Sequence, residues 1–274
     1  MKKTIDWKIF LKDMLKEKIH FGNKGIFKFK MIDYIFTPNL KSNFNIIDIT
    51  KTAYLLSMTC NLVFYAAKEK KTFLIISQQK NIKEIKPIII KTNRFLTKWF
   101  VRNNKKVRNK IKKKFKLKRK KKKINNKYNT LKLNYIKFIS ERIRCHYINK
   151  KIRAGLLTNW LTTKIKLQNL LISKKKSTLT QKKQLIKFSN TLEGIKYMTK
   201  IPDVVILIDP QNDIILRECF TLKISTICLI NLDTEINIDL ADIVIPINTL
   251  KLSSIIFMLN KLSYAILTGF YINN

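Results

Sequence analysis

A lysine-rich block in the middle of the chain limits what this sequence can fold into more than any other feature. Residues 85–140 contain 22 Lys and Arg side chains and no Asp or Glu. Like charges at this density repel one another and do not pack into an apolar core. We therefore interpret residues 85–133 as an insertion within a folded domain, and we expect it to stay flexible until it meets an anion.

The positive charge extends well beyond this block. The whole chain has 57 Lys and Arg against 17 Asp and Glu, a formal net charge of +40. Residues 142–200 have 15 basic side chains and a single Glu, whereas residues 201–274 have 4 basic and 8 acidic ones. A chain this basic needs a polyanionic partner, which is most often nucleic acid and otherwise an anionic membrane surface. No uninterrupted apolar run is long enough to cross a bilayer; the longest candidate starts at Leu252.

Alternating strand and helix patterns predict an α/β fold for the last third of the chain. Three runs are mainly apolar, which is typical of parallel strands buried on both faces: 203–209, 224–230 and 241–247. Pro210 suits a helix start, and we expect a helix within 211–222. We expect a closing helix within the stretch 253–270, with Gly269 past its end. The pattern predicts a parallel sheet sandwiched by helices, of the flavodoxin-like or Rossmann-like kind.

The rest of the chain adds further elements of the same kind. The patterns predict helices over 5–19 and 50–71 and strands over 45–49, 72–77 and 145–148. Two helical stretches, 157–172 and 179–195, are joined by a short connection and predict a protruding antiparallel hairpin, a coiled coil. We divide the chain into the parts 1–84 (α/β domain, first part), 85–133 (insertion), 134–156 (return to the α/β domain), 157–192 (helical hairpin) and 193–274 (α/β domain, second part).

Cys145 and His146 are adjacent and suggest a nucleophile with its base, or half of a metal site. In a strand, however, neighbouring side chains point to opposite faces. The only other histidine is His20, and the four cysteines form no CxxC pair. We therefore expect a buried thiol beside a polar residue at a strand edge, with neither catalysis nor metal binding.

Asp209 and Asp213 follow a predicted strand. Ligands of doubly wound sheets bind at the carboxyl ends of strands, so a Mg²⁺-dependent enzyme is one interpretation. The interpretation we favour is that both carboxylates stabilise the N-terminus of the next helix. The glycine-rich fingerprints of dinucleotide-binding and P-loop proteins are absent from the sequence, and we expect no cofactor.

Basic side chains interleaved with aromatic ones favour RNA binding, because lysines contact phosphates and aromatic rings stack on bases. The candidate RNA-binding residues are Lys24, Lys28, Lys30, Lys150, Lys151, Arg153, Asn159, Trp160, Lys164 and Lys166. Trp160 offers a flat face for stacking, and with Asn159 it would fix the base of the hairpin. In the alternative interpretation, the lysines form an ordinary solvated surface and Phe27 and Phe29 belong to the core.

Six stretches, in the same order, resemble signature stretches of small-ribosomal-subunit protein two in its plastid form. They are KIHFGN, YIFTPN…NIIDITKTAYLL, RCHYINKK…GLLTNW, LEGIKYMTKIPDVVILIDPQ, LRECFTLKISTICLIN and DLADIVIPIN. The resemblance covers about residues 1–80 and 134–274. It departs from the family at Asn23, where the family has His, at 152–155, where it has Trp-Leu-Gly-Gly, and at 247–249, where it has Gly-Asn-Asp.

The resemblance implies a structural, non-enzymatic role in the small ribosomal subunit. The expected partners are small-subunit rRNA and neighbouring ribosomal proteins near the mRNA exit side of the head–body region, with no membrane and no small-molecule substrate. Two alternatives remain, a free basic RNA-binding protein and the enzyme that would use Asp209 and Asp213. The match begins at the start of the chain and leaves no room for a transit peptide, and the favoured residues have A/T-rich codons. We therefore expect a plastid-encoded protein, with a mitochondrial one as the alternative.

Overall fold

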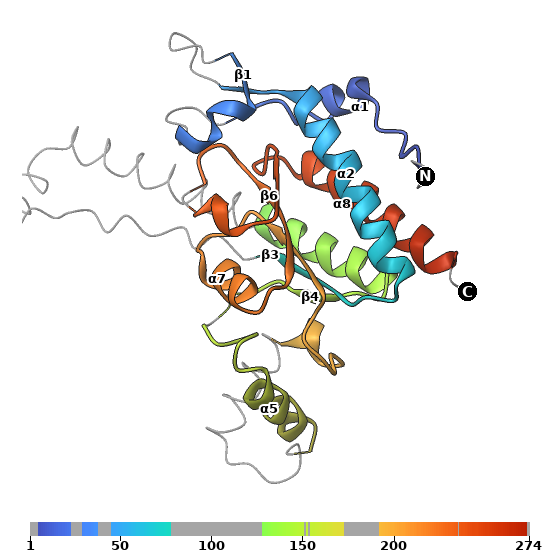
Figure 1. Cartoon of the computed structure of the whole chain (residues 1–274), viewed down its shortest axis with the longest axis vertical. Coiled ribbons are helices and arrows are strands. Elements are labelled where there is room, and N and C mark those ends of the chain that lie inside the picture. Colours follow the sequence, from blue (N-terminus) through green and yellow to red (C-terminus); the bar gives the residue numbers. More distant parts are fainter. Residues whose placement is uncertain are drawn as a thin grey trace, which may run out of the picture. The chain divides into compact units, whose positions relative to one another are not determined.

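The chain falls into two units. The first unit consists of Met1–Gln79 and Leu133–Asn274, and the second is Lys80–Lys132. Our computed structural model describes residues 5–22, 29–37, 45–77, 128–150, 152, 154–172, 192–234 and 236–272. The account below concerns the first unit (Figure 1). The predicted insertion and most of the second helical stretch of the predicted hairpin lie outside the described residues.

A five-stranded parallel sheet organises the first unit. In spatial order its strands are β4 (His146–Ile148), β3 (Phe73–Ser77), β5 (Val204–Ile208), β6 (Ser225–Ile230) and β7 (Ile243–Pro246). All neighbouring pairs run parallel. The first of these strands in the chain, β3, lies between the second and the third, which is the flavodoxin-like order with its switch point between β3 and β5. The predicted fold class is confirmed.

The apolar side chains of each strand alternate between two cores. In β5, Val204, Ile206 and Ile208 face one core. Val205 and Leu207 face the other. The strands β3 and β6 alternate in the same way. Because both faces are covered, these strands appear in the sequence as unbroken apolar runs.

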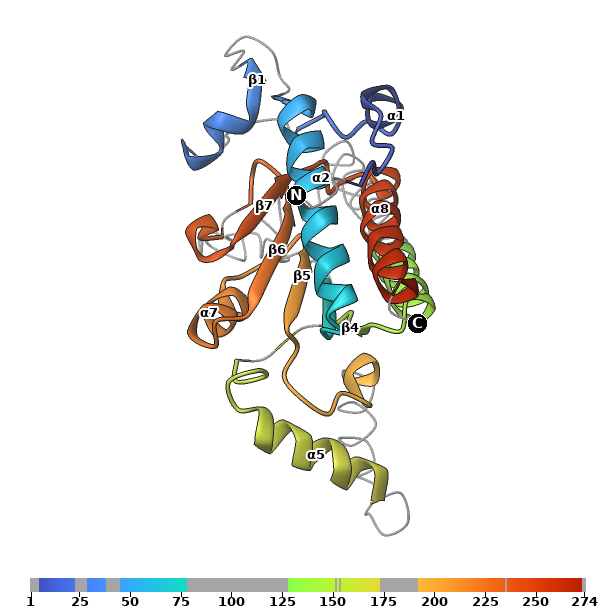
Figure 2. The same ribbon diagram turned by 45° about the vertical axis from the view of Figure 1, so that its right-hand side comes forward.

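Long helices cover the first face of the sheet. These are α2 (Ile49–Lys68), α8 (Leu252–Tyr271) and the C-terminal part of a helix over 128–142, which Figure 2 shows beside one another. The Asp48 carboxylate caps α2 by accepting hydrogen bonds from the backbone N–H groups of Thr50 and Lys51 at 2.9 and 3.3 Å. The predicted first helix is shorter than expected: α1 spans only Leu11–Lys16, because Lys8 adopts a left-handed φ of 51° that helical backbone does not allow.

The contact between α2 and α8 corrects the prediction for Gly269. This residue lies inside α8 rather than past its end. A Cβ atom at Gly269 would lie 2.5 Å from the carbonyl oxygen of Phe64 and 2.6 Å from the Cβ of Ala67. Glycine here allows the two helices to approach closely and does not end one of them.

The stretch 253–270, within which the closing helix was predicted, agrees with α8 to within one residue at each end. The uninterrupted apolar run is shorter than the helix, because Asn260 and Lys261 interrupt that run in the sequence. Among the described residues, α8 is the one helix long and apolar enough to cross a membrane by length and composition. Half of the corresponding window is buried inside the fold. The buried apolar side chains of α8 belong to the first core, as those of a core helix do.

Shorter elements cover the second face. α7 (Ile214–Thr221) packs there through Ile215, Leu216 and Cys219, next to the start of α5 (Trp160–Ile172). α7 does not begin at Pro210 as predicted, because the chain first bends through 211–213 after Asp209, whose φ is 53°. The remaining elements are η1 (Phe29–Tyr34), β1 (Ile35–Thr37), β2 (Ile46–Ile47), η3 (Glu193–Ile195) and η4 (Ile238–Leu240).

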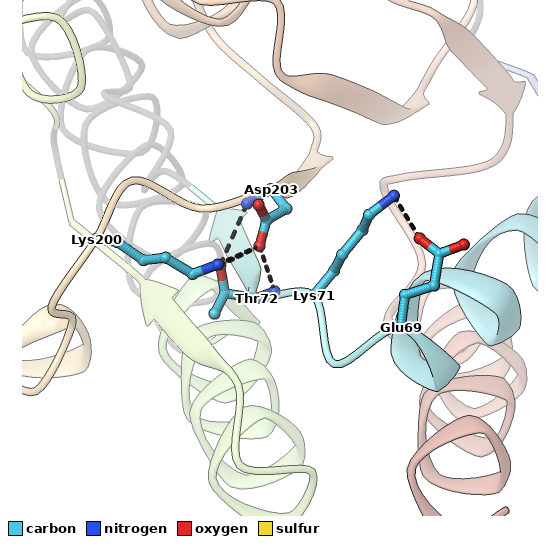
Figure 3. Close-up of polar contacts among 5 residues, drawn as sticks. All are labelled: Glu69, Lys71, Thr72, Lys200 and Asp203. Atoms are coloured by element: carbon cyan, nitrogen blue, oxygen red, sulfur yellow. Dashed lines mark hydrogen bonds and ion pairs between the residues drawn. The ribbon is translucent and has the colours of Figure 1, made fainter. Parts of the chain in front are cut away.

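Carboxylates tie neighbouring strands together at the amino end of the sheet. Asp203, just before β5, accepts hydrogen bonds from the backbone N–H and the hydroxyl of Thr72, just before β3, at 2.7 and 2.8 Å (Figure 3). Asp242, just before β7, accepts one from the backbone N–H of Thr226 in β6 at 2.8 Å. Lys200 adds an ion pair to Asp203 at 3.1 Å. These contacts help to set the register of the strand pairs.

Candidate nucleic-acid interface

The best-defined part of the candidate interface is the segment 154–160, which we call the α5 root. It follows β4 after a short connection and turns continuously until α5 begins at Trp160. Gly155 takes a positive φ of 85°, a conformation in which glycine has no steric penalty. The carbonyl of Asn159 accepts hydrogen bonds from the backbone N–H and the hydroxyl of Thr163 at 3.1 and 3.2 Å. These bonds close the first turn of the helix.

A buried carboxylate on α7 holds the α5 root in place. Glu218 accepts hydrogen bonds from the backbone N–H groups of Gly155 and Leu157, each at 2.7 Å, and of Thr158 at 3.3 Å. Glu218 is only 7% exposed. A buried carboxylate is stable when hydrogen-bond donors surround it, and here the three N–H groups supply them.

Sequence reasoning missed Glu218, although a signal was present. In the predicted helix over 211–222, Glu218 falls three residues after Ile215 and four before Leu222, on the apolar face of the helix. A charged residue on the buried face of a helix needs a partner inside the protein. The sequence could not show that this partner is backbone some 60 residues earlier.

Trp160 is buried with the second core and is 6% exposed. Its ring is therefore not free to stack on a base, and the interpretation of Trp160 as a stacking face is wrong in this structure. Its neighbour Leu157 is fully buried in the same core. Apolar packing of these two side chains and the carboxylate of Glu218 hold the α5 root together. The predicted role of Asn159 and Trp160 at the base of a hairpin stays a prediction.

Three predicted lysines lie near the α5 root. Lys150 is exposed just after β4, while Lys164 is half-buried and Lys166 is exposed on α5. At 100° per residue, Lys164 and Lys166 point roughly 200° apart around the helix. Asn159, next to them, is exposed.

The other predicted basic residues cannot be placed at this interface. Lys24, Lys28, Lys151 and Arg153 lie outside the described residues. Lys30 belongs to η1, but its side chain is likewise outside the described part of the chain. Their role in RNA binding stays a prediction.

Asp209 and Asp213 lie where the chain passes from β5 to α7. Asp209 is 2% exposed, and its backbone N–H donates to the carbonyl of Leu229 at 2.8 Å. Asp213 is the N-cap residue of α7, and its carboxylate accepts a hydrogen bond from the backbone N–H of Asn237 at 2.9 Å. Among the described residues, no group of three or more His, Cys, Asp or Glu is placed to hold a metal ion.

Cys145 and His146 point to opposite faces of the sheet, as predicted. Cys145 belongs to the first core, and burial raises the pKa of its thiol to about 12. His146 opens β4, and burial lowers the pKa of its imidazole despite a backbone hydrogen bond at Gly194. A protonated thiol with its neighbouring imidazole across the sheet does not form a nucleophile–base pair.

Comparison with known families gives one match that spans most of the chain. The profile of the family described as Ribosomal protein S2 matches residues 14–135 and 129–269. The match includes the sheet, both helical layers and the α5 root.

Proposed function

The chain belongs to the ribosomal protein S2 family, and from this premise we propose that it binds the rRNA of an organellar small ribosomal subunit. Family membership makes it a structural protein of the small subunit in translation, and not an enzyme. Its partners are accordingly those of a ribosome, rRNA and other ribosomal proteins. The rRNA contacts and the organelle are the proposal.

The observation that carries rRNA binding is the fixed α5 root with cationic side chains beside it. Glu218 and the buried Trp160 hold this segment before any ligand binds. Lys150 and Lys166 are exposed on either side of it. Phosphate contacts from such a preorganised segment cost less conformational entropy than contacts from a mobile one. The basic residues outside the described part of the chain, including the lysine-rich 85–133 stretch, would add further phosphate contacts.

We further propose that the organelle is a plastid. The sequence is rich in residues with A/T-rich codons and has only 5 Gly and 5 Pro, as expected of an A/T-biased organellar genome. The signature stretches quoted above resemble the plastid form of the family. A mitochondrion with the same codon bias is the second candidate.

Sedimentation tests the proposal. Plastid lysate is centrifuged through a sucrose gradient at moderate salt and high Mg²⁺, and the protein is located by mass spectrometry. We expect stoichiometric co-sedimentation with the small subunit, followed by protein–rRNA crosslinks at peptides around the α5 root. Finding the protein only at the top of the gradient, with intact ribosomes present, would favour a free RNA-binding protein instead.

A further inference from the structure

The solvent-facing side of α2 is apolar. The stretch 52–67 contains no charged side chain, whereas 27% of all residues in the chain are charged. One side of α2 packs in the first core. On another side Tyr54, Met58 and Leu62, which we call the α2 strip, follow one another at intervals of four residues and are 66%, 49% and 37% exposed. A helix that is uncharged and largely apolar all round is normally covered on all sides, which points to a partner over the α2 strip.

The α2 strip leads into a cleft at the amino end of the sheet. Leu62 belongs to both, and the cleft has a volume of about 620 Å³. Its apolar lining comes from α2 and from the segments just before β5 and β6: Leu62, Tyr65, Ala66, Pro202, Leu222 and Ile224. An apolar strip with a hollow at one end offers a partner a line of contact and a pocket for one anchoring side chain.

Two pairs of opposite charge lie at this cleft. Lys71 forms an ion pair with Glu69 at 2.7 Å, and Asp203 forms one with Lys200 at 3.1 Å (Figure 3). Both carboxylates would repel an RNA phosphate, and the α2 strip has no ammonium group to attract one. This surface therefore suits an apolar protein segment better than it suits RNA.

Exposed lysines border the α2 strip at both ends. Lys51 lies about one turn before Tyr54, and Lys68 and Lys70 follow at the other end of α2. Lys223 adds a further exposed cation at the cleft. Charge complementarity with this pattern requires a partner that is apolar along its middle and acidic at its ends.

We propose that the α2 strip and its cleft bind an amphipathic helix of a neighbouring ribosomal protein, with an apolar face and with Asp or Glu near both ends. Family membership makes other ribosomal proteins partners of this chain. The α2 strip is about 12 Å long, so about two turns of a partner helix would cover it before an anchoring side chain enters the cleft. This inference rests on the proposed role in the small subunit, but not on the rRNA contacts.

The first experiment places a photoreactive group on the α2 strip. The full chain is made with p-benzoylphenylalanine at position 58, reconstituted into small subunits and irradiated, and the crosslinked peptides are identified by mass spectrometry. We expect crosslinks to one segment of another ribosomal protein, apolar in its middle and acidic at its ends. The same group at position 138, where Phe138 is 57% exposed on the helix over 128–142, should not reach that segment. Crosslinks from position 58 only to rRNA or to a copy of this chain, or none at all, would overturn the proposal.

The second experiment puts negative charge on the α2 strip. In small subunits purified on a sucrose gradient, Tyr54→Glu with Met58→Glu should lower the amount of the crosslinked protein several-fold relative to the other ribosomal proteins, because burying an unpaired carboxylate is unfavourable. The matched control is Leu131→Glu with Phe138→Glu, two side chains that are 48% and 57% exposed and should tolerate the change. Equal losses with both pairs would refute a docking surface confined to α2.

Folding and incorporation are measured on the same variants. The midpoint of urea denaturation should be the same for both double variants and the wild type, and the crosslink, which needs no charged substitution, decides the question if it is not. If the Tyr54→Glu, Met58→Glu chain enters subunits that keep all neighbouring proteins in full amount, the docking surface is refuted while the role in the small subunit stands. If even the wild type is absent from the subunits, the proposed function fails and this inference fails with it.

Discussion

The acidic side chains of residues 201–272 and the basic ones around the α5 root are used in opposite ways. Asp203, Asp213, Glu218 and Asp242 each accept hydrogen bonds from backbone N–H groups of another segment. Lys150 and Lys166, by contrast, project into solvent. Four of the eight acidic side chains in 201–274 are therefore engaged in contacts within the fold. These carboxylates hold the scaffold together, whereas the exposed ammonium groups are the ones to which the proposed function assigns RNA contacts.

Removing Glu218 should have the largest effect on this division of roles. Glu218→Ala leaves the backbone N–H groups of Gly155, Leu157 and Thr158 without their acceptor. We expect the free energy of unfolding to fall by about 3 kcal/mol, measured by urea denaturation, and hydrogen exchange to accelerate first in the α5 root.

The matched control for this change is Glu193→Ala. Glu193 is an exposed carboxylate that pairs with Lys137 at 2.7 Å. Exposed ion pairs contribute at most about 1 kcal/mol, so this variant should be much less destabilised. Equal destabilisation of the two variants would mean that apolar packing alone holds the α5 root, and that Glu218 has no special role.

Changing the lysines of α5 tests the role assigned to the basic side chains. Lys164→Gln with Lys166→Gln should leave the free energy of unfolding within about 0.5 kcal/mol of wild type. The same pair should lower the salt dependence of rRNA binding, with a slope change of up to about 2. Because the two side chains point in different directions, the single variants show which face of α5 meets the RNA. If the double variant had a clearly lower free energy of unfolding but the wild-type slope of log K against log salt, the two lysines would stabilise the fold and not bind RNA.

Asp203 gives a smaller, pH-dependent effect. Burial raises the pKa of its carboxyl, but the hydrogen bonds from Thr72 and the ion pair with Lys200 outweigh burial, so the pKa lies below its ordinary value. The lowered pKa means that the stabilisation is present near neutral pH and is lost as the pH falls below about 4. Asp203→Asn should therefore cost about 1 kcal/mol at pH 7 and progressively less in acid. A difference between wild type and variant that does not change with pH would exclude the carboxylate charge as its source.

The strands were predictable because the residues that identify each strand lie within or directly beside it. The run 204–208 is apolar at every position because both faces of β5 are covered, and its flanking prolines mark the ends. The α/β class followed from several such runs at regular spacing. Cys145 and His146 were interpreted correctly because alternation along a strand depends only on neighbouring residues.

The errors concern residues whose role depends on a distant segment. Gly269 resembles a helix terminator in the sequence, but its use is set by Phe64 and Ala67 on another helix. Trp160 resembles an exposed ring among lysines, but the second core buries it. Glu218 was overlooked because its acceptor role requires the turn at 155–158 to reach α7. A local pattern shows which residue type is present, and only the fold shows what that residue meets.

The smallest effect is expected at the cysteines, and it tests whether the Glu218 contact acts locally. Burial raises the pKa of the Cys60 and Cys219 thiols to about 12 each, so at pH 8 both should react slowly with iodoacetamide in the native protein. Cys219 directly follows Glu218 in the second core, whereas Cys60 lies on α2 in the first. In Glu218→Ala, alkylation followed by peptide mass spectrometry should become several-fold faster at Cys219 and stay unchanged at Cys60. Equal acceleration at both thiols would show that the carboxylate stabilises the whole unit, because a contact confined to α7 and the α5 root can expose only the core on its own side of the sheet.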